Sequence, residues 1–180
     1  MNFTFVRAIR HSTTRSCGSK EVKSLLPLIE ALDGESYDGD GASCYFYKLN
    51  SRWGIKFCRN KSRALKSYTV HEYLSREATK HVPEVFGPLM IFKVGGVNDE
   101  YSHFKNDQLV YGDVVRICKT LNPGQFSGVE HRAKCLSSRL ARTARGLNRL
   151  TKYICDLFID VHSGNVGYLG QRLVWIDFSI

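Results

Sequence analysis

Two aspartates and an asparagine near the end of the chain have the residue types and spacing that metal-assisted phosphoryl transfer needs. Asp160 precedes Asn165 by five residues, and eleven residues separate Asn165 from Asp177. In this chemistry one carboxylate accepts the proton of the attacking hydroxyl group, while an amide oxygen and a second carboxylate hold Mg²⁺ against the phosphates of ATP. Oxygen atoms are the ligands that this hard cation prefers. We therefore expect Asp160 to be the base and Asn165 and Asp177 to bind Mg²⁺.

The segment that contains these residues resembles the catalytic loop of protein kinases. From Asp160 to Asn165 the sequence reads D-V-H-S-G-N, which is similar to the D-x-H-x-G-N loops of aminoglycoside-type and other atypical kinases. Asp177-Phe178-Ser179 differs from the metal-binding D-F-G triplet only in its last residue. The resemblance implies a protein-kinase-like fold, in which the catalytic loop and the metal-binding triplet flank a short hairpin.

A kinase-like fold requires further features upstream in a fixed order, and the sequence contains them. Gly39 and Gly41, followed by Ser43, open a predicted strand, where backbone N–H groups of a glycine-rich loop approach the phosphates of ATP. Lys56 stands in the place of the strand lysine that contacts the α- and β-phosphates. Glu72 follows Lys56 by sixteen residues in a predicted helix, where it is suited to pair with this lysine and complete the catalytic set.

Among kinases, the family that the chain most resembles is the early serine/threonine protein kinases of T7-like bacteriophages. Their catalytic loop is similar to the stretch from Phe158 to Val166, which also lacks the usual histidine two residues before the catalytic aspartate. The similarity runs from about Gly39 to Ile180 and is strong only from Asp160 to Asp177. It implies a phage factor that uses ATP and Mg²⁺ to phosphorylate host proteins in the bacterial cytoplasm, with Leu109 to Asp113 giving backbone hydrogen bonds to adenine.

Two departures from a conventional kinase keep other functions open. An acidic stretch over 33–40 surrounds the glycine pair and repels a triphosphate unless a metal ion or Lys56 offsets it. Ile180 follows Asp177 by three residues, so we expect a reduced C-lobe without an activation segment. A minimal kinase, a fragment, a non-catalytic pseudokinase that binds and inhibits a host partner, and a small-molecule phosphotransferase are therefore the alternatives.

The positions of apolar, glycine and proline residues predict the elements that carry these side chains. A Gly/Asp-rich turn is expected over 33–42. The predicted helices are 20–32, 63–80 and 129–155, and the predicted strands are 43–49, 53–58, 86–94, 108–111, 166–169 and 173–176.

These elements predict an α+β, protein-kinase-like, two-lobed fold. Residues 1–19 are expected to form a basic arm, 20–112 a β-rich nucleotide-binding N-lobe, and 113–180 a reduced helical C-lobe with the catalytic loop and the metal-binding aspartate.

The 180 residues are 43% hydrophobic, which suits a chain that folds around a core and excludes disorder as its main state. No apolar run approaches the roughly 20 residues that cross a bilayer, so we expect no membrane partner.

The net charge of +9 is unevenly distributed along the chain. Residues 1–20 carry +4, residues 129–155 carry +6, and the rest sum to −1. The predicted helix over 129–155 places its arginines opposite an apolar face. This basic face has three interpretations: a solvated surface, a docking surface for an acidic protein substrate or partner, and, less favoured, a nucleic-acid-binding surface.

The six cysteines include no C-x-x-C pair, which disfavours a zinc ribbon or a redox motif. Several lie in apolar segments, where a reduced cysteine packs as a small hydrophobic residue. We therefore expect a reducing cytoplasm. The basic, serine-rich start also fits an organellar transit peptide, although a solvated arm is the favoured interpretation.

Overall fold

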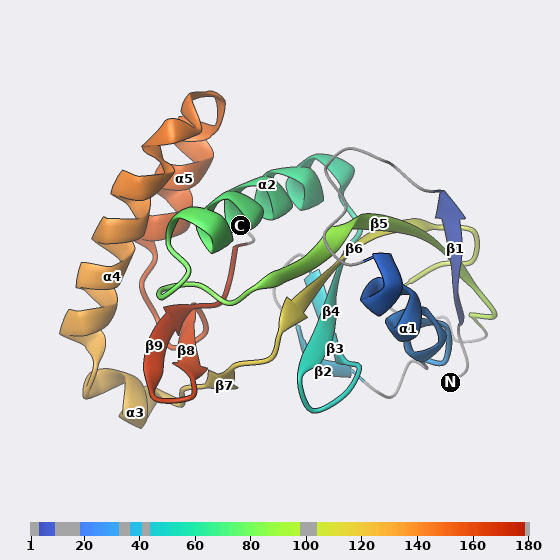
Figure 1. Cartoon of the computed structure of the whole chain (residues 1–180), viewed down its shortest axis with the longest axis horizontal. Helices are drawn as coiled ribbons and strands as arrows, with labels where there is room; N and C mark the ends of the chain where they lie inside the picture. The colour runs from blue at the N-terminus through green and yellow to red at the C-terminus, as the bar shows by residue number, and fades with distance from the viewer. Residues whose placement is uncertain (1–3, 10–18, 33–36, 41–43, 98–103, 179–180) are drawn as a thin grey trace. The chain divides into compact units, whose positions relative to one another are not determined.

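The computed structural model describes residues 4–9, 19–32, 37–40, 44–97 and 104–178 (Figure 1). It contains helices and two antiparallel β-sheets, which confirms the α+β class. The chain divides into two units, Met1–Ala64 with Phe86–Val115 and Leu65–Val85 with Arg116–Ile180. Helix α2 (Lys61–Glu77) begins in the first unit and has most of its length in the second.

A six-stranded sheet forms the first unit, with its strands in the order β1-β5-β6-β4-β3-β2. Its strands are β1 (Thr4–Ile9), β2 (Tyr37–Asp40), β3 (Cys44–Lys48), β4 (Trp53–Cys58), β5 (Val85–Gly95) and β6 (Leu109–Arg116). The aromatic hairpin over 43–58 was predicted, and it forms as β3 and β4 with Asn50 in its turn. The Oδ1 atom of Asn50 accepts hydrogen bonds from the N–H groups of Arg52 and Trp53, which explains why the chain reverses there.

Helix α1 (Ser19–Glu30) contributes to the core of the first unit. Leu25 and Ile29 lie one helical turn apart and are buried in the same cluster as the sheet residues Tyr47, Phe57 and Phe92. The Phe57 ring meets Tyr47 and Phe92 edge-on, with centroid separations of 5.8 and 5.4 Å. Edge-to-face contacts of this kind add to the stabilisation that burial of large apolar rings provides.

The second unit is mainly helical and contains a three-stranded sheet in the order β7-β8-β9. Besides most of α2, its elements are β7 (Lys119–Thr120), α3 (Pro123–Ser127), α4 (Glu130–Thr143), the 3₁₀ turns η1 (Ala144–Gly146) and η2 (Asn148–Leu150), α5 (Thr151–Ile159), β8 (Val166–Leu169) and β9 (Arg172–Trp175). Their apolar faces share one core, in which Leu74, Leu140, Leu157 and Trp175 are almost completely buried. This core supports the loop between α5 and β8.

The single helix predicted over 129–155 is wrong, because the chain forms two helices joined by 3₁₀ turns. Gly146 is a poor helix former, and Leu147 has a non-helical backbone with φ −95° and ψ 58°. A Cβ atom at Gly146 would lie 2.5 Å from the hydroxyl of Tyr73, so a larger residue at this position would displace the Tyr73 side chain. Helices α4 and α5 lie side by side as a helical hairpin (Figure 1). The apolar residues of the predicted face still enter the core, but from two helices.

Four further elements differ from the predictions. Strand β1 was not predicted: it forms within residues 1–19, which were expected to be a basic arm, and it pairs with β5. The expected turn over 33–42 contains strand β2, which pairs with β3. Strand β7 and helix α3 were not predicted, because each is too short to show a periodic pattern. Asn122 begins α3 with a capping box, in which its side chain and that of Gln125 each accept a backbone N–H of the other.

Substitution of Gly167 tests how tightly β7 packs against β8, next to the loop from Asp160 to Asn165. A Cβ atom there would lie 2.8 Å from the carbonyl oxygen of Lys119. Because the obstructing atom belongs to the backbone, we expect Gly167→Ala to lower the free energy of unfolding by about 1–3 kcal/mol. Chemical denaturation followed by circular dichroism measures this change.

Gly128→Ala is the matched control for this test. Gly128 has helical backbone angles, and a Cβ atom there would be 3.6 Å from its nearest neighbour. The control should leave stability unchanged or raise it by up to about 1 kcal/mol. Equal effects of the two substitutions would contradict the tight pairing of β7 with β8.

Candidate active site

The loop from Asp160 to Asn165 follows α5 and is organised by the side chain of Asn165. The Nδ2 group of Asn165 donates a hydrogen bond to the carbonyl oxygen of Asp160 over 2.5 Å. The backbone N–H of Asn165 donates to the carbonyl of His162 over 3.1 Å. The amide nitrogen is thus committed to the backbone of the loop, which leaves Oδ1 as the side-chain atom suited to a cation. Asn165 is buried, so its orientation is restricted.

His162 orients the carboxylate of Asp160. The Nδ1 atom of His162 accepts a hydrogen bond from the N–H of Gly164 over 3.0 Å. A neutral imidazole that accepts through Nδ1 carries its proton on Nε2, and this atom lies 3.4 Å from Oδ2 of Asp160. The Asp160 side chain is 69% exposed, so a substrate hydroxyl group can reach it.

A backbone hydrogen bond brings Asp177 back to this loop. The N–H of Ile176 donates to the carbonyl of Asn165 over 2.8 Å, just outside the hairpin formed by β8 and β9. The indole Nε1 of Trp175 donates to the carbonyl of Asp177 over 2.5 Å. Asn165 and Asp177, which eleven residues separate in the predicted motif, therefore lie close together at the open end of one hairpin.

Phe178 anchors the segment that carries Asp177. Its ring is buried and stacks on the imidazole of His71 in α2, with centroids 4.0 Å apart and planes 12° apart. The Nε2 of His71 lies 2.9 Å from the carbonyl of Pro83, which can only accept, so this nitrogen carries the proton. The hydroxyl of Tyr153 in α5 donates to the carbonyl of Phe178 over 2.5 Å.

Glu72 lies on α2 directly after His71. Its carboxylate is paired with Arg76, one turn further along the helix, with 3.1 Å between Oε2 and Nη2. The Glu72 side chain is 25% exposed whereas that of Arg76 is 64% exposed. An exposed pair of this geometry contributes only about 0.3–0.5 kcal/mol, so Arg76 does not prevent Glu72 from pairing with another cation.

Lys56, Phe46 and Gly39 form one row across the sheet of the first unit. In the strand register Gly39 of β2 lies opposite Phe46 of β3, and Phe46 lies opposite Lys56 of β4. The backbone positions of Gly39 and Lys56 are therefore two strand spacings apart, roughly 10 Å. This juxtaposition suits a lysine and a glycine-rich loop that bind the same phosphate chain. Gly41 and Ser43 lie outside the described residues.

Lys56 shares its face of β4 with a cysteine that sequence reasoning did not single out. Cys58 follows Lys56 by two residues and lies opposite Cys44 in the register. Both cysteines are buried against Ala64 in the first turn of α2. The pKa of the Cys58 thiol is lowered to about 6, chiefly by its hydrogen bond with Cys44. The Asn60 backbone and the positive charges of Arg63 and Lys56 lower it further, while burial opposes them.

The structure does not favour the predicted adenine-binding segment. Leu109 to Asp113 lie inside β6, which has β5 on one side and β4 on the other. Ladder hydrogen bonds occupy the backbone groups along both edges of a strand in this position. We therefore assign no adenine contact to this segment.

Two side chains that the sequence analysis did not identify, His71 and Tyr153, hold Phe178, the residue after Asp177, in place. Each acts across a long sequence separation, so no local motif indicates it.

Within the described part of the chain, no group of three or more His, Cys, Asp or Glu side chains is arranged to hold a metal ion. Mg²⁺ does not need such a group, because it is commonly held by one or two carboxylates together with substrate phosphates and water. Asn165 and Asp177 fit that mode of binding.

No model of a known protein family matches this chain, and comparison with curated proteins finds no match either. Among the described helices, none combines the length and the apolar character that crossing a membrane requires.

Asn165→Asp tests whether the amide donor organises the catalytic loop. The introduced carboxylate would face the carbonyl of Asp160 without a proton to donate, so we expect a loss of about 1–3 kcal/mol in stability at pH 7. The carboxyl pKa should be higher in the folded state than in the unfolded state. The folded variant then binds more protons, and the loss should shrink as the pH falls towards 4.5.

Denaturant titrations at pH 7 and pH 4.5 measure this difference. Asn148→Asp, at an exposed position, is the control and should change stability by no more than about 0.5 kcal/mol. A loss of stability in Asn165→Asp that does not change with pH would contradict a stabilising hydrogen bond from the Asn165 amide to the carbonyl of Asp160.

The lowered pKa of Cys58 predicts a distinct pH dependence of its alkylation. The rate of its reaction with iodoacetamide should reach half its maximum near pH 6, whereas burial raises the pKa of Cys118 to about 11 and keeps that thiol protonated. Cys44→Ala should move the Cys58 midpoint to higher pH, because it removes the main hydrogen bond to the thiolate. Peptide mass spectrometry after timed alkylation gives both midpoints. A Cys58 midpoint that is insensitive to Cys44→Ala would contradict this account.

Proposed function

We propose that this chain has a protein-kinase-like fold and transfers the γ-phosphoryl group of Mg²⁺-ATP to serine or threonine hydroxyl groups of proteins. The observation that carries the proposal is the hydrogen bond between Ile176 and Asn165. It sets Asp177 beside Asn165, whose own side chain is bound to the backbone of Asp160. These contacts support the assignment of Asp160 as the base and of Asn165 and Asp177 as the two oxygen ligands of Mg²⁺ near one end of the β8–β9 hairpin.

Each residue has a role that follows from its surroundings. Asp160 is exposed and oriented by His162, so it is suited to accept the proton of the substrate hydroxyl as the phosphorus–oxygen bond to ADP breaks. Oδ1 of Asn165 and the carboxylate of Asp177 would hold Mg²⁺, which when bound neutralises charge on the phosphates. Lys56 is assigned to the α- and β-phosphates, Gly39 to the loop that covers them, and Glu72 to the alignment of Lys56.

The resemblance to the early kinases of T7-like phages supports protein substrates and a phage factor that acts on host proteins. A carboxylate base of this kind contributes about 10²–10⁴-fold to the rate of proton-coupled reactions. Of the proposed site residues, Asp160 should therefore be the one whose substitution lowers the turnover rate most, compared with its effect on the affinity for ATP.

Transfer of labelled γ-phosphate tests the proposal directly. The wild type should label itself or proteins of a host lysate, and Asp160→Asn should lower the rate at least about 100-fold while it still binds Mg²⁺-ATP. Asp177→Ala should lose the Mg²⁺ dependence of ATP binding. Asp156→Asn removes an exposed carboxylate of α5 outside the loop and should leave the rate unchanged.

Two outcomes would contradict the proposal in different ways. Binding of Mg²⁺-ATP by the wild type without transfer to any acceptor would favour a non-catalytic protein that inhibits a host partner. Transfer to small alcohols or aminoglycosides, with no labelled protein, would favour a small-molecule phosphotransferase.

A further inference from the structure

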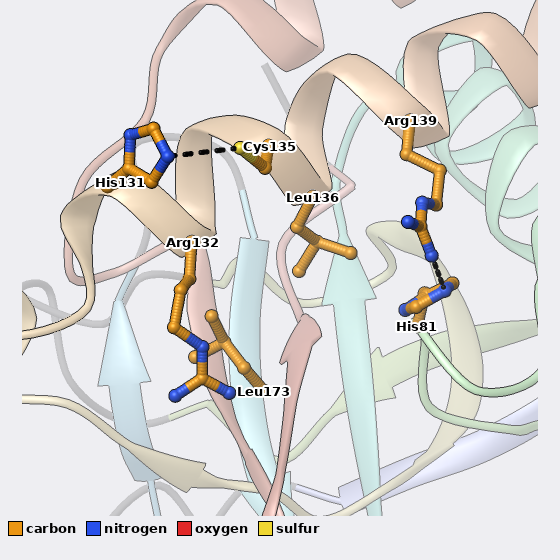
Figure 2. Close-up of a pocket in the computed structure, with 7 residues that line it drawn as sticks. All are labelled: His81, His131, Arg132, Cys135, Leu136, Arg139 and Leu173. Atoms are coloured by element: carbon orange, nitrogen blue, oxygen red, sulfur yellow. Dashed lines mark hydrogen bonds between the residues drawn. The ribbon is translucent and has the colours of Figure 1, made fainter.

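A hollow in the helical unit shares no residue with the loop from Asp160 to Asn165. It has a volume of about 270 Å³ and is bounded by α4, by β9 and by His81, which follows α2 (Figure 2). Arg132, Leu136 and Arg139 occupy one stripe of α4, because they are spaced by four and three residues. Figure 2 shows both arginines extending from α4 on the side that also carries Leu136, with Leu173 of β9 beside Arg132.

His81 holds Arg139 in position. The Nη1 group of Arg139 lies 2.9 Å from Nε2 of His81, and because a guanidinium can only donate, the imidazole accepts. His81 is itself anchored, since its N–H donates to Ala78 over 2.8 Å and its carbonyl accepts from Trp175 over 2.9 Å. Arg139 is therefore positioned in advance and retains further N–H donors for a ligand.

The lining of this hollow carries positive charge that no carboxylate in it balances. Its described residues include Arg132 and Arg139 and no acidic side chain. The acid of α4, Glu130, is paired with Lys134 over 2.6 Å. Burial lowers the pKa of His81, and the charges of Arg139, Lys80 and Arg172 lower it further, so this imidazole stays neutral and keeps accepting from Arg139.

The chemistry of the hollow favours a phosphate group over a carboxylate. A carboxylate has two oxygens and one charge, which a single arginine fork satisfies. A phosphomonoester has three terminal oxygens and a charge near −2, so it offers enough acceptors and charge for two arginine side chains of the same lining. Leu136 and Leu173 supply an apolar surface for the carbon atoms that carry the phosphate.

The same features disfavour nucleic acid as the ligand. A nucleic acid strand binds along a groove that tracks successive phosphates and stacks its bases on aromatic rings. Among its described lining residues, this hollow has no Phe, Tyr or Trp.

We propose that Arg132 and Arg139 form a pocket for phosphothreonine or phosphoserine in a segment of another protein. This binding site goes beyond the proposed phosphoryl transfer and does not depend on it.

Fluorescence anisotropy with a labelled, degenerate peptide pool that carries a central phosphothreonine tests the pocket. The full chain with Asp160→Asn serves as the host protein, so that turnover does not alter the probe. We expect the phosphorylated pool to bind at least tenfold more tightly than the unphosphorylated pool and than a pool with glutamate at the central position. Arg132→Ala and Arg139→Ala should each weaken binding at least about tenfold.

Matched variants separate a pocket from a diffuse basic surface. Arg142→Ala removes an exposed arginine of the same helix outside the lining and should change affinity less than twofold. Arg139→Lys keeps the charge but loses the fork, so it should also weaken binding. Equal losses for Arg139→Ala and Arg142→Ala would overturn the proposal.

Competition experiments identify the source of the phosphate. Inorganic phosphate should compete only at much higher concentrations than the peptide, because it lacks the side chain that contacts Leu136 and Leu173. Equal affinities for inorganic phosphate and peptide, or preferential binding of a single-stranded oligonucleotide, would contradict a phosphopeptide pocket. Phosphopeptide binding is expected whether or not the chain transfers phosphate, so the two proposals can fail separately.

Discussion

The buried amide of Asn165 is the interaction on which the candidate active site depends. The Nδ2 group of its side chain donates to the backbone carbonyl of Asp160, and the backbone carbonyl of Asn165 accepts from the N–H of Ile176. A buried amide without partners is costly, so these bonds link the end of α5 to the end of the β8–β9 hairpin. One residue thereby links the backbone of Asp160, before it in the chain, to the backbone of Ile176, which directly precedes Asp177.

The packing of the helical unit keeps this arrangement rigid from both sides. In α4, the hydroxyl of Ser137 donates to the carbonyl of Phe158, two residues before Asp160. On the other side, Phe178 is held between His71 and the hydroxyl of Tyr153. The loop itself is exposed at Asp160, as a base must be, while the residues that flank it are buried. The position of this loop is thus determined by core packing and not by the loop sequence alone.

The sequence predicted those features whose cause is local. The two hairpins follow from alternating apolar residues around polar turns, and the class of the fold follows from their order. The break after Gly146 was missed because the apolar spacing continues through it, and a single glycine inside an apolar pattern does not by itself end a helix. Likewise the pairing of Cys44 with Cys58 depends on register, and the stacking of Phe178 on His71 depends on how α2 packs, so neither has a local signal.

The interpretation of the basic residues between 129 and 155 also changes once their neighbours in the structure are known. In the sequence, the arginines and lysines between 129 and 155 are equivalent members of one face. In the structure, Lys134 is paired with Glu130, whereas Arg139 is directed by a neutral histidine that adds no negative charge. An arginine held by a carboxylate is already neutralised, but one held by an imidazole keeps its full charge and a fixed direction. The difference between a solvated surface and a binding pocket therefore lies in the partner of each arginine and not in the number of arginines.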